Sequence, residues 1–392
     1  MSNLSYLEKL LDGVEVEWLP LKDVLVRTKG TKITAGQMKT LHKNGAPLKI
    51  FAGGKTVAFV DFNDIPEKDV NREPSIIVKS RGVIEFEYYE KPFSHKNEMW
   101  SYYSDNNAIH IKFIYHFLKL HERHFQGIGS RMQMPQIATP DTDNFLVPIP
   151  CPDNPEKSLA IQAEIVRILD AFTAMTAELT AELTAELNLR KKQYNYYRDQ
   201  LLSFEDGEVE WKALGKITEI NTGQKPSEIL DTEAEFDYIN AGTTRSGYCA
   251  LSNCEGDTVT TPSRGQGGIG FVGYQNKSFW LGPLCYKIRS IDNKELINKY
   301  LFYILQSKNQ LLLGLKKEGG VPAVNKSDLA KLEVPVPSVA EQERIVEILD
   351  KFDTLTTSIQ EGLPREIELR QKQYEYYRDL LLSFPRSNEG AA

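Results

Sequence analysis

The fold of this chain is decided by residues 160–204, which read AIQAEIVRILDAFTAMTAELTAELTAELNLRKKQYNYYRDQLLSF. Residues 340–384 repeat this text as AEQERIVEILDKFDTLTTSIQEGLPREIELRQKQYEYYRDLLLSF, at a constant offset of 180 residues and without a gap. The two stretches are identical at 24 of 45 positions. Agreement over this length does not arise by chance, so the chain is an internal duplication of one structural unit.

Apolar residues recur every three or four positions in both copies, which predicts two long amphipathic helices. The series is Ile165, Ile168, Phe172, Met175, Leu179, Leu183 and Leu187 in the first copy and Ile345, Ile348, Phe352, Leu355, Ile359 and Leu363 in the second. A helix of 45 residues would be about 68 Å long, and an apolar stripe of that length needs a partner. We therefore expect the duplicated helices to pack together as a coiled coil. The alternative is that each helix lies separately on its own domain.

Composition places the chain among ordinary globular proteins. Its 392 residues suit two or three domains, and no apolar run is long enough to span a membrane. The N-terminus, MSNLSYLEKLLDG, lacks the layout of a secretory signal. The cysteines (Cys151, Cys249, Cys254 and Cys285) form no CxxC motif, which favours reduced thiols over a zinc site. These features predict a cytoplasmic protein that does not enter a membrane.

Charge is unevenly distributed along the chain. The net charge of −7 by itself disfavours a polyanionic partner, but residues 24–60 and 258–291 contain no acidic residue. Their basic residues are Arg27, Lys29, Lys32, Lys39, Lys43, Lys49 and Lys55 in the first stretch and Arg264, Lys277, Lys287 and Arg289 in the second. One acid-free basic stretch in each half is typical of a nucleic-acid-binding surface. A solvated charged face is the alternative interpretation.

A variable unit precedes each long helix, and the two variable units share short motifs. These are VEW at 16–18 and 209–211, IFAG at 50–53 and INAG at 239–242, SRG at 80–82 and 263–265, KFIYHFLKL at 112–120 and KYLFYILQS at 299–307, and VPIP at 147–150 and VPVP at 334–337. Short β-like runs between loops rich in Gly, Pro and Asn predict strands around one helix. The expected fold is α+β, with an internal pseudo-two-fold repeat of residues 1–204 onto 205–384. Its predicted parts are variable domains at 1–159 and 205–339, long helices at 160–204 and 340–384, and a tail at 385–392.

Prolines stand just before each long helix, in VPIPCPDNPEKS and VPVPSV. They are expected to end the preceding strand and to prevent the helix from starting earlier. Ser158 and Ser338 are the predicted helix caps.

The glycine-rich run GQGGIG at 265–270 matches the spacing GxGxxG of a dinucleotide site. The residues that follow, FVGYQNKSFW, are extended and aromatic rather than helical, so a flexible loop beside a phosphate backbone fits better. No other stretch matches a catalytic, nucleotide-binding or methyltransferase motif. The sequence therefore predicts a non-catalytic chain that binds neither a metal nor a cofactor of its own.

Basic, amide and hydroxyl side chains in the loops are the candidates for binding DNA, because such groups read base edges and hold phosphates. The leading pair is Arg81 and Arg264, one in each SRG motif. The complete set is Lys29, Lys32, Lys55, Ser80, Arg81, Gln224, Lys225, Arg245, Ser263, Arg264 and Gln266.

Two diverged globular units, each followed by a long helix that ends in QYxYYRDxLLSF, resemble the specificity subunit of type I restriction–modification systems. The three TAEL tetrads, whose leucines are Leu179, Leu183 and Leu187, resemble the subgroup called type IC. This resemblance implies that each variable unit is a target-recognition domain for one half of a split DNA sequence, and that the helices form an antiparallel coiled coil that sets the spacer. It further implies two modification subunits, which hold S-adenosylmethionine, and restriction motor-nuclease subunits as partners, with double-stranded DNA as the ligand. The second helix departs from the pattern, because Gly362 and Pro364 replace TAEL and are expected to kink it.

Two other functions remain open on the sequence. One is a duplicated scaffold or adaptor that binds only proteins, for which the acidic second helix is the best argument. The other is a self-contained enzyme that uses the GQGGIG loop. Salt-dependent binding to a split DNA site and a cofactor-binding assay separate these alternatives from DNA recognition.

Overall fold

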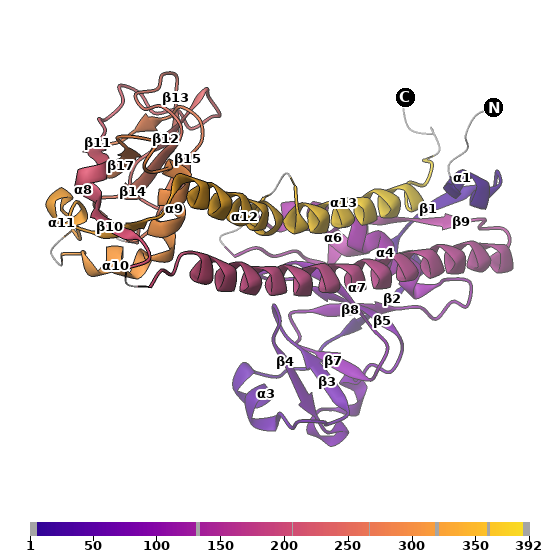
Figure 1. Cartoon of the computed structure of the whole chain (residues 1–392). Coiled ribbons are helices and arrows are strands. Elements are labelled where there is room, and N and C mark those ends of the chain that lie inside the picture. The colour runs from indigo at the N-terminus through magenta and orange to yellow at the C-terminus, as the bar shows by residue number, and fades with distance from the viewer. Residues whose placement is uncertain are drawn as a thin grey trace. The chain divides into compact units, whose positions relative to one another are not determined.

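The computed structural model of the chain describes residues 6–130, 134–205, 207–265, 267–317, 321–358 and 361–386. The chain divides into two compact units, of which unit 1 comprises Met1–Ala181 with Glu368–Ala392 and unit 2 comprises Glu182–Ile367. Helices α7 (Pro155–Leu201) and α13 (Leu363–Leu381) each contribute residues to both units (Figure 1). Each unit therefore contains helical residues from both copies of the repeated stretch.

Unit 1 builds its variable domain from short strands and helices. The helices are α1 (Tyr6–Leu11), α2 (Leu21–Val24), α3 (Ala35–Leu41), α4 (Ile111–Leu120), α5 (Glu122–Gly129) and α6 (Thr139–Asp143), with 3-10 turns at Phe62–Asp64 and Glu67–Asp69. The strands are β1 (Val16–Pro20), β2 (Val26–Lys29), β3 (Leu48–Phe51), β4 (Val57–Val60), β5 (Ser75–Lys79), β6 (Glu85–Tyr89), β7 (Phe93–His95), β8 (Trp100–Tyr103) and β9 (Leu146–Pro150).

Unit 2 repeats the plan with different lengths. Its helices are α8 (Leu214–Ile217), α9 (Asn298–Ser307), α10 (Asn309–Gly314), α11 (Lys326–Leu329) and α12 (Val339–Thr357). Its strands are β10 (Glu210–Ala213), β11 (Thr218–Thr222), β12 (Phe236–Ile239), β13 (Gly247–Cys249), β14 (Thr258–Pro262), β15 (Gly273–Gln275), β16 (Trp280–Leu281), β17 (Cys285–Ser290) and β18 (Glu333–Val336).

Strand order is the same in the two units. Unit 1 has sheets β1-β9, β2-β8-β5-β6 and β4-β3-β7, and unit 2 has β10-β18, β11-β17-β14-β15 and β13-β12-β16. In both three-stranded sheets the first neighbour of the central strand is antiparallel and the second is parallel. The predicted α+β fold and its internal repeat are confirmed at the level of topology.

The repeated helix of each variable domain supplies the centre of that domain's core. Phe113, Ile114, Phe117 and Leu118 of α4 are buried, and the residues 187 positions later, Tyr300, Leu301, Ile304 and Leu305 of α9, are buried as well. Their spacing by one, three and four places all of them on one side of the helix, against the four-stranded sheet. The KFIYHFLKL repeat therefore marks a core element.

A buried glutamine ties each long helix to its variable domain. In unit 1, Gln162 accepts a hydrogen bond from the backbone N–H of His110 at 2.9 Å and donates to the Ala108 carbonyl at 3.0 Å. In unit 2, Gln342 accepts from the Ile297 N–H at 2.9 Å and donates to the Glu295 carbonyl at 2.8 Å. Both side chains are fully buried. The amide thus satisfies loop backbone groups that would otherwise lie buried without partners.

Replacement of Gln342 by leucine should destabilise unit 2, because it leaves a buried N–H and a buried C=O without partners, each costing about 1–3 kcal/mol. Gln162→Leu should have the same effect on unit 1. Urea denaturation measures both losses, and the exposed Gln371→Leu on α13 serves as the control. Unchanged unfolding midpoints in both variants would contradict the role assigned to the glutamines.

The first long helix begins earlier than its proline-rich leader suggested. Pro155 is the first residue of α7 and Ser158 lies inside the helix and is buried, so the predicted start at 160 and the predicted Ser158 cap are wrong. The Asn154 side chain caps the helix instead, accepting from the Lys157 N–H at 3.0 Å. Proline is tolerated in the first helical turn, where its missing N–H has no helical partner in any case. The Ser338 cap is confirmed, because its hydroxyl accepts from the Glu341 N–H at 3.4 Å.

The second long helix is interrupted. Helix α12 ends at Thr357 and α13 begins at Leu363, so the predicted continuous helix 340–384 is corrected to two helices. Gly362 has a positive φ of 83°, and a Cβ atom there would lie 2.6 Å from the Thr354 carbonyl oxygen. Pro364 occupies the first turn of α13, where no helical N–H is needed. The segment therefore forms two helices rather than one bent helix, with Gly362 just before the second helix and Pro364 in its first turn.

Within each unit the two copies of the helical repeat contact each other. In unit 1 the Phe172 and Tyr377 rings lie 5.7 Å apart, and the Thr173 and Tyr374 hydroxyls lie 3.0 Å apart. In unit 2 the corresponding rings, Phe352 and Tyr197, also lie 5.7 Å apart. In unit 1 the partner of residue 172 is residue 377 and the partner of residue 173 is residue 374, so the two helices run antiparallel. This confirms the predicted packing of the two copies in unit 1.

The end of each repeat packs into the variable domain of the other copy. Leu381, Leu382 and Phe384, at the end of the second copy, are buried in the core of unit 1. Leu202 and Phe204, at the end of the first copy, pack in the core of unit 2. The core of unit 1 is therefore completed by residues from the far end of the sequence, and that of unit 2 by the segment that directly precedes its variable domain.

Candidate nucleic-acid interface

The two SRG motifs form the same turn in both units. In unit 1 the Ile137 N–H donates to the Ser80 carbonyl at 3.0 Å and the Gly82 N–H donates to the Pro135 carbonyl at 2.9 Å. In unit 2 the Val324 N–H donates to the Ser263 carbonyl at 2.9 Å and the Gly265 N–H donates to the Pro322 carbonyl at 3.1 Å. Both glycines have a positive φ, 75° at Gly82 and 121° at Gly265, which explains why glycine follows the arginine.

The predicted serines of these turns are both buried. Ser80 is 1% exposed and its hydroxyl donates to the Glu98 carbonyl at 2.7 Å, while Ser263 is 4% exposed. The arginines between serine and glycine are exposed, and neither Arg81 nor Arg264 forms an ion pair with any residue that the structure describes. The turns therefore present one exposed arginine at the same place in each unit.

Arg81 lies at the edge of a pocket of about 500 Å³ in unit 1. The pocket wall also includes Asn97, Glu98, Gln136 and Asp141. Burial alone would raise the pKa of Glu98, but the Lys96 ammonium, 2.6 Å away, and the more distant Arg81 hold that pKa below its ordinary value. Ionised carboxylates, amides and a guanidinium are the groups that distinguish base edges. Sequence reasoning missed Asn97 and Gln136, because they are brought to Arg81 by separate loops.

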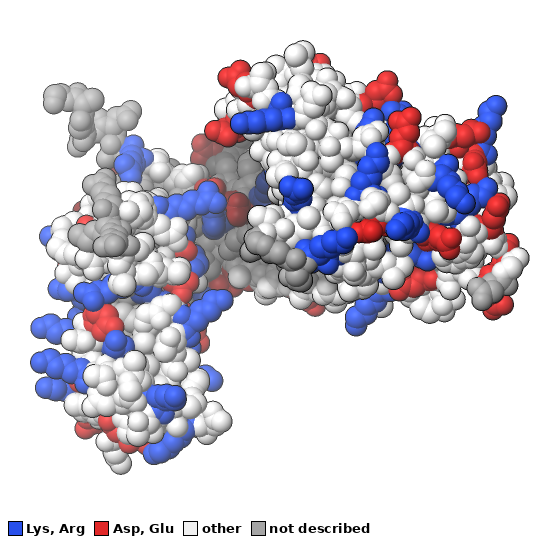
Figure 2. Space-filling view, turned by 90° about the vertical axis from the view of Figure 1, so that its left-hand side faces the viewer, with Lys and Arg blue, Asp and Glu red and all other residues white. Residues whose placement is uncertain are grey.

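The predicted lysines of unit 1 gather near a small lobe formed by α3 and the β4-β3-β7 sheet. Lys29, Lys32 and Lys55 are exposed and form no ion pair with the described residues. Figure 2 shows lysine and arginine side chains spread over the lobe at its lower left, the part that lies lowest in Figure 1. By contrast, Lys43 is neutralised by Asp61, 2.5 Å away. The lobe thus keeps free positive charge in a stretch of sequence that lacks acidic residues.

The predicted residues of unit 2 have mixed surroundings. Gln224 and Lys225 are exposed, although the Gln224 carbonyl accepts a hydrogen bond from the Trp280 indole at 2.8 Å. Arg245 lies 3.0 Å from Asp237 and 4.1 Å above the Tyr248 ring, so its orientation is fixed and its charge is compensated. Gln266 lies outside the described residues.

The leucines of the TAEL tetrads form a half-buried stripe along α7. Leu179, Leu183 and Leu187 are partly buried, whereas the alanine and glutamate before each of the first two are exposed. This alternation confirms the helical spacing on which the spacer prediction depends.

The remaining chemistry of the chain is sparse. Within the described ranges, no group of three or more His, Cys, Asp or Glu side chains is placed to hold a metal ion. The cysteines are unpaired, and burial raises the pKa of the Cys285 thiol to about 12. In the same part of the chain, no helix is both long and apolar enough to cross a membrane.

Comparison with known proteins identifies relatives along almost the whole chain. A family described as "Type I restriction modification DNA specificity domain" matches residues 14–189 and 207–369. The EcoR124I/EcoR124II type I restriction enzyme specificity subunit of Escherichia coli is 40% identical over 419 residues, covering 98% of each chain. The EcoprrI specificity subunit of Escherichia coli is 37% identical and covers 92% of this chain and 93% of its own. The solved S subunit from M. genitalium has a TM-score of 0.55 at 18% identity, covering 96% and 98% of the two chains.

Proposed function

The chain belongs to the family of type I restriction–modification DNA specificity subunits, and on this premise we propose how its two units share the recognition of one DNA target. It is the DNA-recognition subunit of a type I complex. Unit 1 reads one half of a split target through the surface around Arg81, and unit 2 reads the other half through the surface around Arg264. Recognition is thus divided between two copies of one fold.

The observation that carries this proposal is the pair of SRG turns. The backbone hydrogen bonds of the turns are the same in both units, and each turn carries an exposed arginine between its serine and its glycine, while the flanking sequences differ. A shared fold with a shared arginine suits two domains that both bind the DNA backbone. Different residues around that arginine suit the recognition of two different base sequences.

The helices connect recognition to the partner subunits. The TAEL stripe of α7 sets the spacer between the two half-sequences. Two modification subunits dock on the chain, bring S-adenosylmethionine and carry out the methylation, and restriction subunits join the larger complex. The chain itself is non-catalytic and cytoplasmic. The names of its relatives as specificity subunits support this division of labour.

Arg81→Ala should weaken discrimination in one half of the target only, and Arg264→Ala should weaken it in the other half. A lost base contact costs about 1–3 kcal/mol of discrimination, whereas a lost phosphate contact weakens binding to all sequences alike. The measurement is the set of methylated motifs in cells that express the complete system with either variant.

Each arginine variant is the control for the other, because both remove one exposed guanidinium from the same turn. Relaxed preference in opposite halves supports the assignment. Unchanged preference and affinity in both variants would remove the SRG turns from the interface.

A further inference from the structure

One place in the fold is filled in unit 1 and hollow in unit 2. In unit 1 it holds four charged side chains between β3, β5 and β6. The Lys79 ammonium lies 2.6 Å from Glu85 and 2.8 Å from Glu87, and Lys49 lies 3.6 Å from Glu87. Burial alone would lower the pKa of Lys79, but the two glutamates together raise it. This network occupies the space between the two sheets.

Strand register identifies the corresponding residues of unit 2. Ile77 and Thr260 are equivalent, because each stands the same number of residues before the serine of its SRG motif. On the neighbouring strand, Ile77 pairs with Glu87 and Thr260 pairs with Gly273. Glycine therefore stands where unit 1 has Glu87, and Pro262 stands where it has Lys79. A Cβ atom on Gly273 would lie 2.9 Å from the Thr260 hydroxyl. Loss of the two charged side chains leaves a pocket of about 440 Å³.

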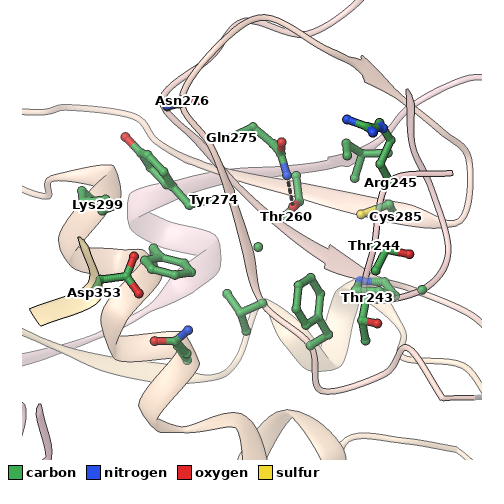
Figure 3. A pocket seen from close by; sticks show the side chains of 18 residues that line it. Thr243, Thr244, Arg245, Thr260, Tyr274, Gln275, Asn276, Cys285, Lys299 and Asp353 are labelled. Carbon is green, nitrogen blue, oxygen red and sulfur yellow. Dashed lines mark hydrogen bonds between the residues drawn. The ribbon is translucent and has the colours of Figure 1, made fainter. Parts of the chain in front are cut away.

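Two loops form the rim of this pocket. The loop that follows the INAG motif contributes Thr243, Thr244 and Arg245 (Figure 3). The glycine-rich loop packs directly on it, since a Cβ atom on Gly268 would lie 2.9 Å from the Gly242 nitrogen. The glycine-rich loop also begins immediately after Arg264, so the pocket lies next to the proposed DNA-binding surface.

The charges of the lining are compensated. Arg245 is paired with Asp237 at 3.0 Å, and Lys299 lies 3.3 Å from Asp350. The lining also includes the carboxylate of Asp353. A phosphate group would require cations without such partners, so the lining favours a neutral ligand.

The rest of the lining suits a flat polar ring. The Phe271 side chain is 38% exposed and supplies the accessible aromatic face of the pocket. The Lys299 ammonium covers the Tyr274 and Phe302 rings, at 4.4 and 5.2 Å from their centroids. Gln275 also lines the pocket, and its amide lies 3.4 Å from the Thr260 hydroxyl (Figure 3). This long contact leaves the Gln275 amide available for a ligand. Aromatic walls with hydroxyl and amide groups are the features by which proteins hold a base outside the helical stack.

We propose that this pocket of unit 2 is a binding site for a single nucleobase, stacked on its aromatic wall and read by Thr243, Thr244 and Gln275. The proposal rests on the proposed function, because the base comes from the DNA half-site that unit 2 reads. A free nucleoside offers the same chemistry and is the other source of the ligand.

Fluorescent base analogues placed in the DNA target test whether one base leaves the helical stack and enters the pocket. Duplexes carry one 2-aminopurine or pyrrolo-cytosine at each position of the half-site assigned to unit 2, and are bound by the assembled methylation complex. We expect a severalfold rise in fluorescence at one position. Thr244→Trp, an exposed-loop change that fills the pocket, should abolish the rise and weaken target binding by about tenfold or more. Ser246→Ala, in the same loop but outside the lining, should change neither.

Calorimetric titration of the same complex with adenosine, guanosine, cytidine and thymidine tests the free ligand. Selective binding of one nucleoside that is lost in Thr244→Trp and in Gln275→Ala supports the site. A fluorescence rise that persists in Thr244→Trp arises elsewhere and counts against it. The proposal is overturned if no nucleoside binds, no position responds to Thr244→Trp, and target affinity is unchanged. Intact sequence-specific binding in that case leaves the proposed DNA recognition standing.

Discussion

Deletion of Thr184–Leu187 is expected to shorten the unread spacer of the DNA target by one base pair and to leave both half-sequences unchanged. Four helical residues advance about 6 Å along the axis and turn roughly 40° beyond a full circle. DNA rises about 3.4 Å and turns roughly 34–36° per base pair. The rotation therefore matches one base pair and the rise nearly two. The rotation should decide, because a domain that faces the wrong side of the groove cannot read bases, whereas bending absorbs a small axial misfit.

The structure makes this deletion unusually conservative. Helix α7 is continuous through the tetrads, and their leucines share one half-buried stripe. Because the tetrads have identical text, removal of one leaves Leu183 in the environment that Leu187 had before. The stripe is kept while the helix shortens by about 6 Å.

Mapping of methylated sites in cells decides the outcome. We expect complete replacement of the original motif by one with the shorter spacer. The control is a variant with alanine at residues 184–187, which keeps the length of the helix and should keep the original spacer. If the deletion variant still methylates the original motif, the tetrads do not set the spacer.

Phe384→Ala is expected to destabilise unit 1 by about 3–5 kcal/mol, although residue 384 lies near the end of the chain. The Phe384 side chain is 7% exposed and meets the Phe113 ring edge-on at 5.6 Å. Leu381 and Leu382 are buried in the same core. Removal of the ring leaves a cavity beside α4, the central helix of the variable domain, so recognition of the half-sequence read by unit 1 should fail first.

Urea denaturation with hydrogen exchange as the local probe measures this loss. Ser383→Ala is the matched control. Ser383 is next to Phe384 in the sequence but its side chain is exposed, so its replacement should change the free energy of unfolding by no more than about 0.5 kcal/mol. Equal stability of the two variants, or reduced protection confined to unit 2, would show that the C-terminal residues do not complete the core of unit 1.

The sequence by itself determined the duplication, the amphipathic helices and the family, because each of these follows from patterns of residues along the chain. Identity at a constant offset and a spacing of three and four need no knowledge of distant contacts. The prediction of α+β domains and the equivalence of the SRG and KFIYHFLKL repeats are confirmed for the same reason. The type IC subgroup and the DNA contacts of single residues stay predictions.

Only the tertiary structure decided which of the repeated residues are accessible. Ser80 is buried because the loop that contains Ile137, more than fifty residues away in the sequence, forms a hydrogen bond with its backbone. The SRG motif itself does not identify this partner. Pro155 starts α7 because Asn154 caps it, and α12 ends at Thr357, where Ser358 takes an extended conformation well before Gly362. The hollow beside Gly273 exists because strand register sets glycine and proline where the other unit has charged side chains. Burial, register and pockets depend on contacts between distant segments, and these form only when the chain has folded.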